Sequence, residues 1–206
     1  MEYPTKYLTK GTKIDINDER TIYYFTNYYQ LDKVKDLPTD NPKRQCSERL
    51  YSLAKKGYQD YYAYFASCIM SHFRDFDGYD WSVCTVPGHA QTQKISNNMD
   101  KFLSRVCFPQ NIKPVVGTII RIKEMPKKHG SDYGPRTVEK DLDSFTGDTR
   151  NIIDRNFIIF DDITTSGSSL EAARKFLKRR GANKVVCIAL GKTVDDYYGG
   201  YINNWF

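Results

Sequence analysis

Short apolar runs alternate with segments of helical period along this chain. Residues 80–86 (DWSVCTV), 157–160 (FIIF) and 184–190 (KVVCIAL) are almost continuously apolar. Runs of this kind are typical of strands that are buried on both faces of a parallel sheet. The β-prone residues at 21–29 (TIYYFTNYY) and 113–123 (KPVVGTIIRIK) predict two further strands.

Three segments place apolar residues at helical spacing. The first lies between residues 44 and 73, the second follows residue 89, and the third spans 170–180. Pro109 ends the second helix and Gly181 ends the third. The stripes expected to face the core are Tyr62, Phe65, Ile69 and Phe73; Ile95, Met99, Phe102 and Val106; and Leu170, Ala173 and Leu177. We interpret the aromatic stripe as core packing and not as a platform for stacked bases.

Alternating strands and helices predict an α/β fold with a mainly parallel central sheet flanked by helices. We expect one domain over residues 1–206, with an N-terminal extension (1–77), an α/β core (78–194) and a tail (195–206). Residues 1–20 and 31–42 are polar and predict irregular structure.

The polar connection at 124–148 contains glycines, prolines and clustered cations. Connections of this length in compact domains are usually lids, binding loops or disordered segments. We therefore expect residues 124–148 to act as a mobile hood over a ligand.

Charge and cysteine content narrow the class of protein. The net charge of +6 and the pI of about 8.9 favour anionic ligands without indicating nucleic acid in particular. Five scattered cysteines, with no CxxC pair, predict reduced and buried thiols in a cytoplasmic protein. Residues 1–13 lack the apolar region of a signal peptide, and no apolar run approaches the length of a membrane span.

Residues 156–170 (NFIIFDDITTSGSSL) combine the features that suggest a binding site. An apolar run ends in two adjacent carboxylates, Asp161 and Asp162, and a turn rich in hydroxyls and glycine follows. Ser168 and Glu171 have the spacing of a capping box, so a helix is expected to begin there.

Each part of this order suits one part of a phosphorylated sugar. A helix start offers unpaired N–H groups and a positive dipole end to a phosphate. Gly167 would let the backbone approach that anion. Two carboxylates can accept hydrogen bonds from vicinal hydroxyls or help to hold a divalent cation. The pattern predicts a ribose 5-phosphate ligand, and the GxxxxGK[ST] spacing of a Walker A loop is absent.

Residues 157–169 resemble the phosphoribosyl-pyrophosphate (PRPP) motif of the type I phosphoribosyltransferases along their whole length. From about residue 55 to 194, the order of elements is similar to the ComF-like branch of that family. The resemblance implies a type I phosphoribosyltransferase-like fold and a cytoplasmic homodimer. It also implies Mg²⁺-dependent transfer of ribose 5-phosphate from PRPP to a small nitrogenous acceptor, with release of pyrophosphate.

The chain departs from the family pattern in three places. It lacks the zinc-binding cysteine cluster that ComF proteins often carry near the N-terminus. The Arg-rich segment usual after the first core strand is reduced to His89 and Lys94. Position 165 is Thr, whereas purine-salvage relatives place a carboxylate there, so purine salvage is less favoured.

The resemblance assigns roles to individual residues. Asp161 and Asp162 would hold the ribose 2- and 3-hydroxyls and, directly or through water, Mg²⁺. The expected 5-phosphate-binding residues are Thr164, Thr165, Ser166, Gly167, Ser168 and Ser169. The expected pyrophosphate-binding residues are Pro87, Gly88, His89, Arg121, Lys123, Lys127, Lys128, His129 and Arg136. His72 is expected to be structural.

Two other functions fit the same motif. The chain could bind PRPP as a regulatory or competence-associated accessory protein without turnover, or it could bind a different phosphorylated ribose such as a nucleotide. Nucleic acid is a conceivable partner of the accessory protein, although no motif indicates it.

Overall fold

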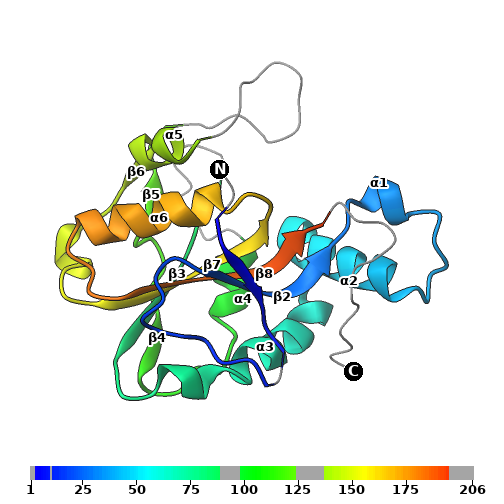
Figure 1. Ribbon diagram of the computed structural model, residues 1–206, viewed down its shortest axis with the longest axis horizontal. Coiled ribbons are helices and arrows are strands. Elements are labelled where there is room, and N and C mark those ends of the chain that lie inside the picture. Colours follow the sequence, from blue (N-terminus) through cyan, green and yellow to red (C-terminus); the bar gives the residue numbers. More distant parts are fainter. Residues whose placement is uncertain (1–2, 10, 89–97, 124–136, 195–206) are drawn as a thin grey trace.

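A parallel sheet of six strands forms the centre of the protein, in the order β1-β2-β8-β7-β3-β4 (Figure 1). The computed structural model describes residues 3–9, 11–88, 98–123 and 137–194. The strands of this sheet are β1 (Thr5–Tyr7), β2 (Ile22–Tyr28), β3 (Trp81–Thr85), β4 (Ile112–Pro114), β7 (Asn156–Thr164) and β8 (Val185–Thr193). Two further strands, β5 (Ile120–Arg121) and β6 (Phe145–Thr146), form a separate antiparallel pair. The α/β fold with a mainly parallel sheet is therefore confirmed.

Helices cover both faces of the sheet (Figure 1). One face carries α5 (Val138–Asp143) and α6 (Ser168–Arg179), and η4 (Thr149–Asn151) precedes β7. The other face carries α2 (Pro42–Tyr51), the π-helical turn η1 (Ser52–Lys56), η2 (Gln59–Tyr61), α3 (Tyr62–Met70), η3 (Phe73–Phe76) and α4 (Asn98–Leu103). A short helix, α1 (Leu31–Val34), follows β2.

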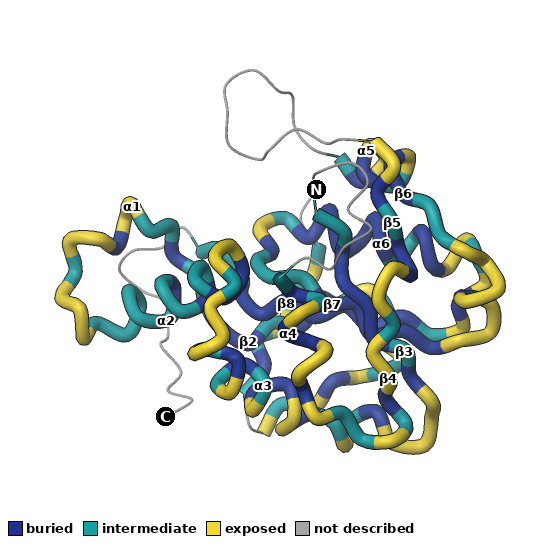
Figure 2. Tube along the Cα trace, turned by 180° about the vertical axis from the view of Figure 1, so that it is seen from behind, coloured by how far each residue is buried: buried dark blue, intermediate teal, exposed yellow. Residues whose placement is uncertain are grey.

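Strand β7 is buried on both faces, as its continuous apolar run predicts. Phe157 and Ile159 pack in the cluster that contains Leu170 and Leu177 of α6. Alternate residues of the strand pack in the opposite cluster, with residues of α3 and α4. Figure 2 shows β3, β7 and β8 as a largely buried centre, with the exposed stretches mainly in the peripheral loops and turns. Because hydrophobic layers pack on both faces of the sheet, the carboxyl ends of its parallel strands, which lie along one edge of the sheet, are held in fixed positions.

The predicted helical stripes face the core where the structure describes them. Tyr62, Phe65 and Ile69 are buried, and Phe73 packs partly buried against the same cluster. This confirms core packing for the aromatic stripe. Gly181 follows the end of α6 with φ of 87°, a conformation that glycine adopts without strain.

Four expectations about irregular segments and strands are wrong. Residues 1–20 contain β1, which pairs with β2, and residues 31–42 contain α1. The single strand expected at 113–123 is broken, because Gly117 with φ of 76° forms a turn between β4 and β5. The connection at 124–148 is not irregular throughout, because it contains α5 and β6, which pack on the core; its action as a mobile hood stays a prediction. Residues 124–136 lie outside the described part of the chain.

The cysteines follow the expectation only in part. All five are free, and Cys68, Cys84 and Cys187 are buried, whereas Cys46 is half-buried and Cys107 is exposed. In the ranges that the structure describes, none of the helices combines the length and the apolar character that crossing a membrane requires.

Candidate functional site

The connections that leave β3 and β7 run in opposite directions. After β3 the chain passes to β4 on one side, and after β7 it passes through α6 to β8 on the other. The two strands are neighbours, and the N–H of Val86 donates to the carbonyl of Phe160 at 3.0 Å. Such a switch point leaves a crevice beyond the carboxyl ends of the strands, where ligands of α/β proteins bind. The structure brings the turn at Pro87–Gly88 and the acidic pair of β7 to this edge.

Backbone N–H groups orient both carboxylates of the acidic pair. The N–H of Asp162 donates to Oδ1 of Asp161 at 2.9 Å, and the N–H of Ile163 donates to Oδ1 of Asp162 at 2.6 Å. Both aspartates are half-buried at the end of β7.

Lys55 is the site residue that the sequence interpretation missed. Its Nζ lies 2.7 Å from Oδ2 of Asp162, although the two residues are 107 positions apart. Partial burial lowers the pKa of Lys55, but the carboxylates of Asp162 and Asp161 outweigh this and raise it above its usual value. The lysine therefore remains charged beside the acidic pair. Nothing in the local pattern around residue 55 signals this contact.

Hydrogen bonds between hydroxyl groups hold the turn before α6, and one of them reaches β8. The hydroxyl oxygens of Thr165 and Thr193 are 3.0 Å apart, and the hydroxyl of Ser166 donates to that of Ser168 at 3.2 Å. Thr164 is buried, whereas Thr165 is exposed. The hydroxyl-rich turn thus lies between the carboxyl ends of β7 and β8 and the start of α6.

The predicted capping box is wrong. Gly167 is the N-cap of α6 and makes no side-chain cap, and the N–H of Ser168 reaches only the hydroxyl of Ser166, at the long distance of 3.5 Å. Glu171 donates its backbone N–H to the carbonyl of Gly167 at 2.9 Å, while its carboxylate is drawn to Arg174 and Lys175 on its own helix. The start of α6 therefore has no built-in carboxylate to satisfy it, which favours an external anion.

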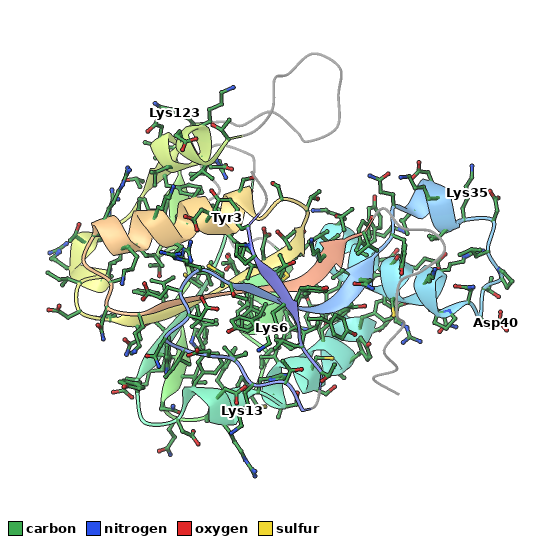
Figure 3. All side chains as sticks on the ribbon, in the orientation of Figure 1. Tyr3, Lys6, Lys13, Lys35, Asp40 and Lys123 are labelled. Carbon is green, nitrogen blue, oxygen red and sulfur yellow. The ribbon has the colours of Figure 1, made fainter. Side chains whose placement is uncertain are left out.

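Gly167 meets the N-terminal segment of the chain. It has φ of 82°, and a Cβ on it would lie 2.5 Å from Cδ1 of Ile22 and 3.3 Å from Cβ of Tyr3. The N–H of Tyr3 also donates to the carbonyl of Ser166 at 3.3 Å. Figure 3 shows Tyr3 beside the beginning of α6. The shape of this turn thus depends on glycine and on the segment that leads into β1.

We expect Gly167→Ala to destabilise the fold by about 1–3 kcal/mol, because it combines a left-handed backbone with a steric clash. Urea unfolding measures this loss. Gly11→Ala is the control, since a Cβ on Gly11 would meet no atom within 4 Å. Equal unfolding midpoints for the two variants would contradict the packing role of Gly167.

A buried arginine connects the turn after β3 to the rest of the site. The guanidinium of Arg121 pairs with Oδ1 of Asp141 at 3.0 Å, and both side chains are almost fully buried. Its Nε donates to the carbonyl of Gly88 at 2.5 Å, and its Nη2 donates to that of Pro87 at 3.3 Å. The hydroxyl of Ser169 donates to Oδ2 of Asp141 at 3.4 Å. One polar network therefore fixes the turn after β3 relative to the first turn of α6.

This network gives Arg121 a role within the protein. Its donors are used by the turn carbonyls, Asp141 and the hydroxyl of Ser144, and its guanidinium lies over the ring of Phe145 at 4.7 Å. Arg121 is thus beside the expected pyrophosphate turn, but the contacts shown are with the protein. Direct contact with pyrophosphate stays a prediction.

The other predicted residues divide into described and undescribed positions. Lys123 is exposed near α5 (Figure 3). His72 is buried, with Nδ1 3.2 Å from Oδ2 of Asp75, in agreement with a structural role. Five expected pyrophosphate residues lie outside the described ranges: His89, Lys127, Lys128, His129 and Arg136.

The acidic pair suits Mg²⁺ that is bound by only one or two protein carboxylates better than a metal whose ligands all come from the protein. Within the described ranges, no group of three or more His, Cys, Asp or Glu side chains could hold a metal ion. Mg²⁺ commonly binds through one or two carboxylates, with waters and phosphate oxygens completing its shell. Asp161 and Asp162 could supply these carboxylate ligands.

Comparison with known proteins gives no independent family assignment. No protein-family model matches the chain, and no curated protein matches it in sequence.

Proposed function

We propose that the protein is a Mg²⁺-dependent phosphoribosyltransferase with a type I, ComF-like fold. The observation that carries the proposal is the order of groups at the switch point. Two carboxylates lie near the end of β7, a hydroxyl- and glycine-rich turn follows, and the start of α6, whose N-cap is Gly167, comes next. The turn at Pro87–Gly88 lies on the neighbouring strand. Groups for a diol, a phosphate and a pyrophosphate therefore share one edge.

The side chains suggest a division of labour in PRPP binding. Asp161 and Asp162 would accept hydrogen bonds from the ribose hydroxyls, and the N–H groups of residues 167–169 would bind the 5-phosphate. Bound Mg²⁺ would neutralise charge that develops on the departing pyrophosphate. The turn carbonyls of Pro87 and Gly88 are already occupied by Arg121, and proline has no N–H, so within the described residues the N–H of Gly88 is the turn's donor for an anion.

The reaction would need no protein nucleophile. Displacement of pyrophosphate at the anomeric carbon passes through an oxocarbenium-like state, and the acceptor nitrogen supplies the electron pair. Burial raises the pKa of Cys187 to about 12 and also raises that of Cys84, so these thiols stay protonated. The site would act by orientation and charge stabilisation.

We expect PRPP with Mg²⁺ to raise the melting temperature. A ligand at a hundred times its Kd stabilises the folded state by about 2.7 kcal/mol, or about 5–10 °C in Tm for a chain of this size. Differential scanning fluorimetry with PRPP, ribose 5-phosphate, pyrophosphate and nucleotides measures the shift. Pyrophosphate release with a panel of bases then tests turnover. No shift with PRPP would reject the proposal, and a larger shift with a nucleotide would favour a nucleotide-binding module.

A PRPP-binding protein without turnover is the second candidate. One observation favours it. Position 165, which in purine-salvage relatives carries a carboxylate that assists the base, carries a threonine here, and its hydroxyl lies 3.0 Å from that of Thr193. A PRPP-dependent thermal shift without pyrophosphate release from any base would support this candidate over the enzyme.

A further inference from the structure

We propose that Lys55 is an internal cation of the acidic pair, which holds Asp162 in the free protein and moves to a phosphate oxygen when a divalent cation binds the aspartates. The proposal rests on the proposed function and extends it to a residue of η1, on the sheet face that also carries α2, α3 and α4. Nothing in the PRPP motif itself points to this residue.

The contact between Lys55 and Asp162 occupies the oxygen that a metal would need. The backbone N–H of Ile163 already binds Oδ1 of Asp162, and Nζ of Lys55 lies 2.7 Å from Oδ2. A divalent cation binding at that oxygen would stand within a few ångströms of the ammonium group, and like charges at such a distance repel. Metal and lysine therefore compete for Asp162.

The ammonium group of Lys55 is free to leave Asp162 for another acceptor when a metal competes for that carboxylate. Its side chain is 52% exposed while that of Asp162 is 18% exposed, so the ammonium lies at the solvent side of the pair. Its one hydrogen bond with a side chain in the described part of the chain is to Asp162. An ammonium group has three donors, so two remain for other acceptors. A PRPP molecule at the acidic pair would bring phosphate oxygens to that side.

The backbone that carries Lys55 is well anchored. Lys55 lies on the π-helical turn η1, a distortion that occurs often at functional sites. Gly57 ends this turn with φ of 68° and packs against the side chain of Asn98, whose Nδ2 donates to the carbonyl of Ala54 at 3.0 Å. The turn is thereby tied to α4. Only the flexible lysine stem has to move.

The neighbouring lysine provides a matched control. Lys56 belongs to the same turn, but its Nζ lies over the rings of Tyr51 and Tyr58 at 6.0 and 5.5 Å. Replacing either lysine by Met removes one positive charge from η1. Only Lys55→Met removes the partner of Asp162.

The test measures two affinities in wild type, Lys55→Met and Lys56→Met. Mn²⁺ alone, followed by electron paramagnetic resonance, reports competition for the carboxylates. Calorimetric titration of PRPP with saturating Mg²⁺ reports the contact with phosphate. We expect Lys55→Met to bind Mn²⁺ several-fold more tightly. We expect it to bind PRPP with Mg²⁺ about tenfold more weakly, as for one lost charge-assisted hydrogen bond. Lys56→Met should match wild type in both.

The two measurements separate this inference from the proposed function. Equal Mn²⁺ affinity in wild type and Lys55→Met, or no Mn²⁺ binding to either, would overturn the role of Lys55 even if PRPP binds. Unchanged PRPP affinity in Lys55→Met would overturn the contact with phosphate. If wild type does not bind PRPP but the Mn²⁺ difference persists, the proposed function fails and the competition for Asp162 stands. A structural ion pair predicts a lower unfolding midpoint with both affinities unchanged.

Discussion

Replacing Asp161 and Asp162 together by Asn should lower the affinity for PRPP with Mg²⁺ by about a hundredfold or more. Asn keeps the size and one acceptor oxygen, so the backbone hydrogen bonds from Asp162 and Ile163 can persist. The two negative charges that Mg²⁺ and hydroxyl donors require are lost. Charge-assisted hydrogen bonds contribute roughly 1.5–3 kcal/mol each, and two of them account for the expected change.

Calorimetry of wild type and the double variant measures this loss. The control is Asp77→Asn with Asp80→Asn, which removes the same charge from two exposed residues ahead of β3, at the opposite edge of the sheet. The control should bind PRPP like wild type. The acidic pair would be structural if the Asp161/Asp162 variant unfolded at a much lower temperature while its affinity stayed unchanged.

Arg121→Met should destabilise the fold by about 3–5 kcal/mol. The substitution leaves the carboxylate of Asp141 buried without its ion-pair partner, and breaking a buried pair from one side is strongly destabilising. It also removes the donors to the carbonyls of Pro87 and Gly88. Urea unfolding gives the free-energy change. Arg150→Met is the control, because the pair of Arg150 with Asp148 is exposed and should contribute little.

A second variant separates two effects of losing Arg121: the stability cost of an unpaired buried carboxylate, and the loss of the donors that position the turn after β3. Arg121→Met combined with Asp141→Leu replaces the buried pair by apolar side chains and should recover much of the lost stability. PRPP affinity should be below that of wild type in Arg121→Met and in this double variant, since the turn carbonyls lack their donors in both. A loss of less than about 1 kcal/mol in Arg121→Met would show that the pair is not a major contributor. Full recovery of PRPP binding in the double variant would show that the turn does not depend on Arg121.

The sequence predicts best those elements whose signal is local. The run at 157–160 and the stripe of Leu170, Ala173 and Leu177 identify β7 and α6, because burial on both faces demands unbroken apolar residues. The order of these elements also places the acidic pair at the carboxyl edge. Only the cap of α6 is mistaken, since Glu171 has cationic neighbours on its own helix that compete for its carboxylate.

The elements that the sequence misses depend on distant partners. The three residues of β1 (TKY) have no strand pattern of their own and become a strand by pairing with β2. Lys55 reaches Asp162 across 107 positions, and a lysine on a polar stretch is more often solvated. Arg121 looks like a ligand cation in the sequence, and only its burial beside Asp141 reveals that it serves the turn.

The strand order has a consequence for how the protein folds. Strand β2 has β1 and β8 as its neighbours, and Ile22 pairs with Cys187, so one side of the sheet closes across more than 160 positions. Non-local pairing of this kind slows folding, because the entropy of closing the chain is lost before the contacts form. Tyr3 likewise meets Ser166 only at that stage. During synthesis, β2 must therefore wait with its hydrophobic residues uncovered until β8 has left the ribosome, and chaperone dependence should be greatest in that interval.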